Sequence, residues 1–117
     1  MERTEKMKEV FSIMSDGERV TALLAGEIDH HAAAPIREAV DSEMFLRRPE
    51  KLYLDFSKVR FMDSSAIALI IGRVELARSI GCAVFVTGLS RTQEKLVKLS
   101  GIERLEGVTV EKLEVKK

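Results

Sequence analysis

Two adjacent serines, Ser64 and Ser65, follow Asp63 where an apolar strand gives way to an apolar helix. A serine hydroxyl at such a junction can serve as a nucleophile, as a helix cap, or as the acceptor of a phosphate from another enzyme. A nucleophile needs a base within reach, and His30 and His31 are the only histidines in the chain. The G-x-S-x-G elbow and the glycines of an oxyanion hole are absent. The sequence therefore argues against a hydrolase.

The histidine pair does not form a recognisable metal site. Glu27 and Asp29 lie nearby, but no ligand spacing such as H-x-x-x-H occurs, and the single cysteine, Cys82, lies apart in the apolar run "CAVFV". Phosphate-binding loops of the G-x-x-x-x-G-K-[ST] and G-x-G-x-x-G types are also missing. We therefore predict neither a metal nor a cofactor, and we interpret His30 and His31 as part of a polar loop that opens a helix.

Helix capping explains Asp63 and Ser64 without any further function, because both residue types satisfy N–H groups of the first turn and stabilise a helix by about 1 kcal/mol. The helix that follows, however, is apolar on two sides. The side expected to pack on a sheet holds Ile67, Ile70, Ile71 and Val74. The other side holds Leu69, Leu76 and Ile80, with Ser65 and Gly72 between them and Arg73 beside them. This second side either packs against a neighbouring helix or receives a partner protein, and the pattern leaves both open.

A serine at the start of such a helix is well placed to act as a switch. Phosphorylation would add about −1.5 to −2 charges there. The helix N-terminus would tolerate that charge through its dipole and its free N–H groups. Asp63 would oppose the added charge, and so would a partner that presents carboxylates or apolar surface. We therefore expect phosphorylation to abolish binding while the fold stays intact.

The elements that position these residues follow from periodicity and turn signals. Asp16-Gly17 predicts a tight hairpin, and Ser90 with Gln93 predicts a capping box. The order β-β-α-β-α-β-α-β, with a final helix, predicts one α/β domain over residues 1–117, whose mixed sheet of four to five strands is covered by three to four helices. The expected elements are strands at 9–14 and 19–25, a loop from Gly26 to His31, a helix at 32–45 with Pro35 in its first turn, a short strand ending near Asp55, a helix at 64–80, a strand over "CAVFVTG" covered on both faces, a helix over "LSRTQEKLVKLSG", an edge strand near Arg104 to Glu106 and a last helix from Thr109.

Composition narrows the class of protein further. Nineteen basic residues balance nineteen acidic ones, so no bulk field favours nucleic acid or anionic lipid. The N-terminus "MERTEKMKEV" lacks the apolar stretch of a signal peptide, and no segment reaches the roughly 18 apolar residues of a membrane span. Cys82 has no partner for a disulfide within the chain. We expect a soluble cytoplasmic protein that binds neither nucleic acid nor membrane.

Three segments, "GEIDHH", "LDFSKVRFMDSSAIALIIGR" and "LVKLSGI", resemble the bacterial anti-sigma-factor antagonists of the STAS domain family, of the sporulation and general-stress type. The resemblance covers almost the whole chain and implies that the protein is not an enzyme. It implies that the unphosphorylated protein binds an anti-sigma factor, itself a serine kinase, and so releases the sigma factor. The kinase would inactivate the protein, and a PP2C-type serine phosphatase would reverse this. We expect a monomer when the protein is free.

The resemblance also implies roles for individual residues. The phosphoacceptor position falls on Ser64, and Gly72 and Arg73 match the Gly-Arg of the family's helix. Ala66 stands where the family usually has glycine, and its methyl group is expected to hinder close approach of the kinase. We expect Asp29, Asp63 and Ser65 to flank the phosphorylation site, and the partner-binding residues to be Ala66, Leu69, Gly72, Arg73 and Leu76. The alternative is a STAS scaffold or regulatory subunit of a stress-signalling or lipid-transport complex, without direct control of a sigma factor.

Overall fold

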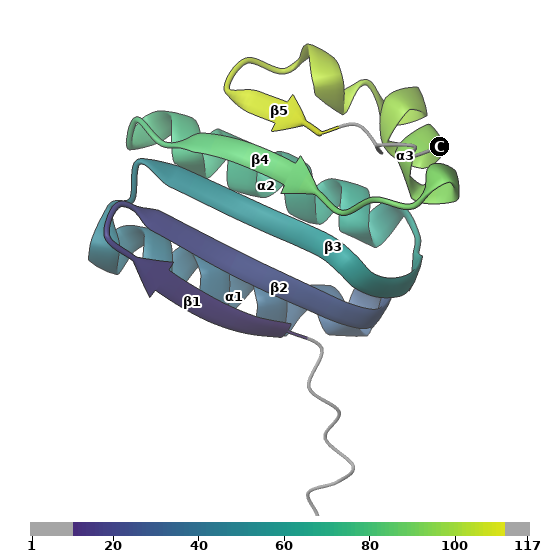
Figure 1. The fold of residues 1–117 in the computed structure, drawn as a ribbon, viewed down its shortest axis with the longest axis horizontal. Helices are drawn as coiled ribbons and strands as arrows, with labels where there is room; N and C mark the ends of the chain where they lie inside the picture. Colours follow the sequence, from purple (N-terminus) through teal and green to yellow (C-terminus); the bar gives the residue numbers. More distant parts are fainter. Residues whose placement is uncertain (1–10, 112–117) are drawn as a thin grey trace, which may run out of the picture.

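A computed structural model describes residues 11–111, and it confirms the predicted α/β fold and element order (Figure 1). The hairpin turns where predicted, with Gly17 at a φ of +64°. The predicted capping box of Ser90 and Gln93 is also present. The elements are β1 (Phe11–Asp16), β2 (Arg19–Ile28), α1 (His30–Arg47), β3 (Lys51–Met62), α2 (Ser64–Ser79), β4 (Ala83–Thr87), α3 (Arg91–Ser100), a 3-10 turn (Ile102–Arg104) and β5 (Val108–Val110).

The five strands form one mixed sheet in the order β1-β2-β3-β4-β5. β1 pairs antiparallel with β2, and all the other pairs are parallel. Parallel strands that follow one another in sequence order through right-handed crossovers place their helices on one face of the sheet. Figure 1 shows α1 and α2 behind the sheet. The core between the two layers holds alternate strand residues, among them Val20, Ala22, Leu24, Leu52, Leu54, Val84 and Val86.

β2 and β3 extend well beyond the rest of the sheet, which the sequence did not predict. The predicted loop from Gly26 to His31 is wrong, because β2 continues to Ile28 and α1 begins at His30. The predicted end of β3 near Asp55 is also wrong, because its pairing with β2 resumes after two register shifts. At the first shift the Asp55 carboxylate accepts a hydrogen bond from the backbone N–H of Ser57, at 2.9 Å. β4 pairs with β3 only as far as Asp55, so the ends of β2 and β3 project as a two-stranded ribbon.

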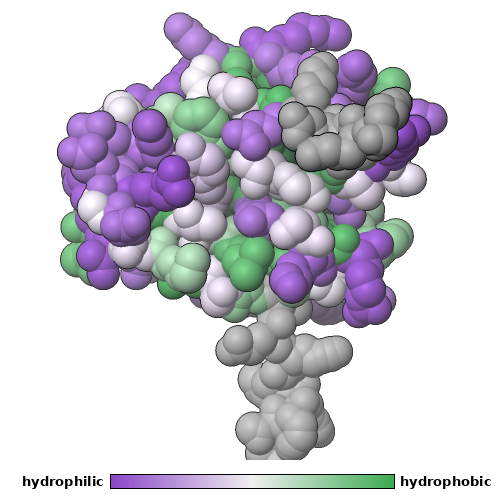
Figure 2. Space-filling view, in the orientation of Figure 1, coloured by the Kyte–Doolittle hydropathy of each residue, from purple (hydrophilic) through white to green (hydrophobic). Residues whose placement is uncertain are grey.

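The second face of the sheet carries no helix within residues 11–111, so the predicted coverage of β4 on both faces is wrong (Figure 1). Phe85 of β4 is half-buried there and stacks on Tyr53 of β3, with ring centroids 4.7 Å apart. The Arg19 guanidinium lies 4.5 Å from the Tyr53 centroid. These contacts cover apolar area without a helix. Figure 2 shows this face as separate apolar patches between neutral and polar residues.

The C-terminal part of the fold differs from both predictions made for it. Residues 104–106 end the 3-10 turn and do not form a strand; the edge strand is β5, Val108–Val110. Gly107, at a φ of +92°, turns the chain toward β4 and accepts a hydrogen bond from the Val84 N–H through its carbonyl. The predicted helix from Thr109 is therefore wrong as far as Glu111, and residues 112–117 lie outside the described part of the chain.

Candidate functional site

Two helices begin next to one another at the carboxyl edge of the sheet. β2 and β3 end in register, with Ile28 opposite Met62, and in each case one aspartate separates the strand from a helix. The Asp29 carboxylate accepts a hydrogen bond from the Ala32 N–H at 2.9 Å and so caps α1. The Asp63 carboxylate accepts one from the Ser65 N–H at 2.8 Å and caps α2. The strand pairing therefore brings the starts of both helices, which are far apart in sequence, to one place.

Ser64 is the first residue of α2, and it is exposed. Asp63, its neighbour, supplies the N-cap, so the side chain of Ser64 is not needed for that role. The N-terminus of a 16-residue helix carries a partial positive charge, and its free N–H groups can donate hydrogen bonds to an anion. Ser64 is thus a hydroxyl in open solvent at a position where the fold can accommodate a phosphate.

Asp29 is more than a loop residue near this position. Its hydrogen bond from the Ala32 N–H, which outweighs a small desolvation effect, lowers the pKa of the Asp29 carboxyl, and the charge of His31 lowers it further. Asp29 therefore carries its negative charge throughout the neutral pH range. Together with Asp63 it places two capping carboxylates at the edge where Ser64 lies.

A groove of about 430 Å³ separates α1 from α2 beside Ser65. Its floor is made of small side chains, and its cationic side chains come from both helices. No acidic residue lines it. Ser65 and Gly72 were predicted to belong to this surface, whereas the contribution of α1 was not predicted, because nothing in the sequence shows which helix packs beside α2. The lining residues are His30, Ala33, Ala34, Arg37, Ser65, Ala68, Leu69, Gly72 and Arg73.

Gly72 has no internal reason to be glycine. A Cβ atom built on it would meet nothing within 4 Å, and its φ is not in the left-handed region. Glycine in the interior of a helix costs about 1 kcal/mol relative to alanine. The residue therefore lowers the stability of the protein while keeping this part of the groove open.

Arg73, itself buried, joins the two helices through an ion pair with the half-buried Asp41. Its Nε lies 2.7 Å from Asp41 Oδ1 in α1, and its Nη2 donates to Asp41 Oδ2 at 3.2 Å. Nη1 donates to the carbonyl of Leu69 at 3.3 Å. Burial lowers the pKa of the Arg73 guanidinium, and Asp41 opposes that shift. Since the side chain is turned inward, it holds α1 and α2 together.

Burial divides the five residues predicted to bind a partner. Ala66 and Leu69 are buried at 0% and 4% exposure, and Arg73 at 6%, although Leu69 and Arg73 still line the groove; direct contact of these three residues with a partner stays a prediction. Gly72 and Leu76 are half-exposed. On the second apolar side of α2, Leu69 is buried whereas Leu76 and Ile80 are half-exposed, so both alternatives, a helix–helix contact and a surface for a partner, stay open.

The described residues give little support for metal binding or for a reactive cysteine. No group of three or more histidine, cysteine or carboxylate side chains within residues 11–111 could hold a metal ion. His30 and His31 stand edge to face, with ring centroids 5.8 Å apart. Cys82 is buried, and burial raises the pKa of its thiol to about 11, so it is inert at neutral pH. None of the helices in this range is both long and apolar enough to cross a membrane.

Comparison with known proteins agrees with this arrangement. The model of a family described as STAS domain matches residues 18–114. An anti-sigma F factor antagonist of Paenibacillus polymyxa is 30% identical over 82 residues, which cover 70% of each chain. The anti-sigma factor antagonist SpoIIAA in its unphosphorylated form is 26% identical, with a TM-score of 0.70 and 89% of each chain covered. The Bacillus cell fate determinant SpoIIAA in the phosphorylated form is 27% identical, with a TM-score of 0.69, and covers 87% of this chain and 91% of that one. Antagonists of this kind are regulatory proteins without enzymatic activity.

Proposed function

The chain belongs to the STAS domain family, and from this premise we propose that it is an anti-sigma-factor antagonist controlled by phosphorylation of Ser64. The unphosphorylated protein binds an anti-sigma factor that is also a serine kinase, and so frees a sigma factor. Phosphorylation ends this binding, and a PP2C-type phosphatase restores it. The whole chain acts in the cytoplasm as one domain.

The exposed Ser64 at the start of α2 is the single observation that carries the proposal. A kinase needs a hydroxyl that it can reach, and the exposed side chain of Ser64 meets that need. In the transfer, Ser64 Oγ bonds to the γ-phosphorus of ATP, ADP leaves, and the hydroxyl proton passes to a base of the kinase. That a similar protein exists in both a phosphorylated and an unphosphorylated form supports this assignment.

Phosphate at Ser64 acts on binding through charge. It adds about −1.5 to −2 charges next to the carboxylates of Asp29 and Asp63. Within the protein, the N-terminus of α2 stabilises that charge. A partner surface that fits against Ser64 would bury the phosphate or bring its own carboxylates close to it, and either costs several kcal/mol. The fold therefore tolerates the modification and the complex does not.

The groove between α1 and α2 is the surface on which the anti-sigma factor docks. It begins at Ser65, and the cationic Arg37 in its lining favours an acidic segment of the partner. The open space above Gly72 admits close approach of a partner backbone. Gly72 and Leu76 contact the partner directly, and the buried Arg73 holds the two walls in place.

Phosphate transfer tests the site. The protein is incubated with the purified anti-sigma factor of its own cell and ATP, and the phosphate is mapped by mass spectrometry. We expect one phosphate on Ser64, loss of labelling in Ser64→Ala, and retained labelling in the matched control Ser65→Ala. Labelling that persists in Ser64→Ala would refute the assignment.

Gly72→Ala tests the groove, because it is expected to raise the stability of the protein and to lower its affinity for the partner. Because the added methyl group meets nothing inside the protein, thermal unfolding should show a gain of up to about 1 kcal/mol in stability. The same methyl group stands in the groove, so affinity for the anti-sigma factor should fall, and Gly72→Leu should lower it further. Unchanged affinity in both variants would rule out the groove as the docking surface.

A further inference from the structure

Phe61 is a large aromatic residue near the end of a strand, yet 52% of its surface is exposed. The cause is the second register shift between β2 and β3. Gly26 pairs with Val59, but the next residue, Glu27, pairs with Phe61, so Arg60 is an extra residue in β3. A bulge of this kind reverses the alternation of side chains beyond it. Val59 and Met62 are buried as a result, and Arg60 and Phe61 both face outward.

A cavity of about 390 Å³ lies beside Phe61, between the end of β3 and the start of α3. Its remaining lining is Arg60, Met62, Ser90, Thr92, Gln93 and Leu96. Gln93 fixes this geometry, because it is buried and its Nε2 donates to the Val59 carbonyl at 3.0 Å. The cavity is therefore bounded by a rigid contact between α3 and β3, and Phe61 stands at its rim.

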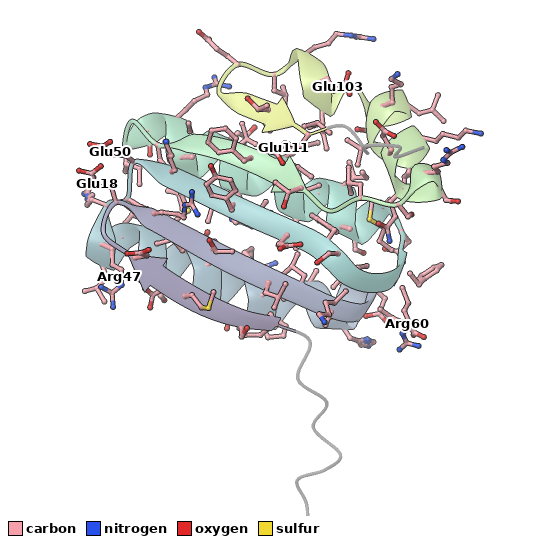
Figure 3. The ribbon with its side chains drawn as sticks, in the orientation of Figure 1. Glu18, Arg47, Glu50, Arg60, Glu103 and Glu111 are labelled. Atoms are coloured by element: carbon pink, nitrogen blue, oxygen red, sulfur yellow. The ribbon has the colours of Figure 1, made fainter. Side chains whose placement is uncertain are left out.

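The position of Phe61 connects it with the phosphorylation site. Phe61 precedes Ser64 by three residues, and both lie at the carboxyl edge of the sheet. Figure 3 shows Arg60 at this end of the molecule, with Arg47 at the opposite end. A single exposed apolar side chain needs no explanation by itself. Here a bulge turns the ring outward, a cavity lies beside it, and Ser64 follows three residues later in the chain.

We infer that Phe61 and the adjoining cavity form a second docking surface for the anti-sigma factor, on the side of Ser64 away from the α1–α2 groove; this inference rests on the function proposed above. Phe61 packs against an apolar residue of the partner, since aromatic anchors dominate the energetics of interfaces. Arg60, exposed beside it, pairs with a carboxylate of the partner. The partner therefore contacts the protein on both sides of the phosphoacceptor, which orients Ser64 toward the kinase active site.

The test compares two phenylalanines. Phe61→Ala is measured against Phe45→Ala, because Phe45 is similarly exposed at 59% but lies near the opposite end of α1. Affinity for the purified anti-sigma factor is measured by calorimetry, and the melting temperature by circular dichroism. We expect a loss of about thirtyfold in affinity for Phe61→Ala and none for Phe45→Ala. The melting temperature of Phe61→Ala should stay within a few degrees of the unmodified protein.

Three outcomes would overturn the inference or its premise, and they are distinct. If the unmodified protein does not bind the anti-sigma factor, the proposed function fails. If it binds and Phe61→Ala binds as tightly, only the second docking surface fails. The third outcome is a lower melting temperature for Phe61→Ala. If deletion of residues 112–117 lowers it equally, and the two changes together lower it no further, then Phe61 holds the chain's own C-terminal segment and the partner assignment is wrong.

Discussion

Gly88 approaches the backbone of β3 more closely than any side chain would allow. It has a φ of +74°, and a Cβ atom placed on it would lie 2.6 Å from the Ser57 nitrogen and 2.8 Å from Asp55 Oδ1. These are the two atoms that form the hydrogen bond at the first bulge of β3. The segment after β4 therefore closes over the bulge, and the course of β3 toward Ser64 depends on a residue without a side chain.

Replacement of this glycine should be far more costly than replacement of another glycine with positive φ. Gly17 is the matched control, since it has a φ of +64° but open space around its Cβ position. Gly17→Ala should cost about 1–2 kcal/mol for the backbone conformation alone. Gly88→Ala adds a clash with backbone, so urea unfolding should show a further loss of about 1–3 kcal/mol. Equal losses in the two variants would mean that the close contact does not matter.

The structural roles of some residues could be predicted from the sequence, and those of others could not. Asp63 and the Ser90–Gln93 box were predicted as caps, because capping depends on residues only two or three positions apart. The role of Asp29 as the cap of α1 was missed, because β2 was expected to end before it. The part-buried pair of Arg73 and Asp41 joins residues 32 positions apart, so no local pattern reveals it.

At the scale of elements, α3 supports the site through one side chain with two functions. Gln93 completes the capping box of α3, where its Oε1 accepts from the Ser90 N–H at 2.9 Å. Its Nε2 also binds the Val59 carbonyl between the two register shifts. The helix is thereby anchored to the part of β3 that extends beyond β4. The capping function was predicted from sequence; the tertiary hydrogen bond was not, because it depends on the unpredicted extension of β3.

The two functions of Gln93 can be separated. Ser90→Ala removes the cap and should cost about 1 kcal/mol. Gln93→Ala removes the other hydrogen bond of the capping box, from the Ser90 N–H to Gln93 Oε1, and also leaves the buried Val59 carbonyl without its partner, so the loss should be about 1–3 kcal/mol greater. Chemical denaturation measures both, and hydrogen exchange should show faster opening of residues 56–62 in Gln93→Ala only. If the two variants are equally destabilised, the tertiary hydrogen bond contributes nothing.

Strand ends and bulges are the elements that sequence patterns describe least well. In β3, alternation holds to Phe56 and then fails twice, since Ser57 and Lys58 are both exposed, as are Arg60 and Phe61. The alternation of buried and exposed residues therefore predicts that the strand ends where the alternation first fails. The pairing with β2 continues through both shifts, because the buried residues Val59 and Met62 still face the core.

At the scale of the whole molecule, the β-β-α-β-α-β-α-β order was predictable because each element has its own period and its own stop signals. The arrangement of helices in one layer then follows from connection handedness. That arrangement gathers Ser64, the α1–α2 groove and the Phe61 surface at one edge, and leaves Phe45 near the other. Because the net charge is zero, the binding proposed at this edge would depend on local shape and local charge, and a phosphate on Ser64 would change that local charge substantially.

The most direct test of this account is the affinity of the Ser64→Asp variant for the purified anti-sigma factor, with Ser42→Asp as the control and circular dichroism as the check on folding. The account predicts that Ser64→Asp keeps the native spectrum and loses at least tenfold in affinity, because a charge in the interface is not compensated. Ser42→Asp adds the same charge on an exposed position of α1 outside the groove and should bind as tightly as the unmodified protein. A natively folded Ser64→Asp protein that binds as tightly as the unmodified protein would contradict the charge switch.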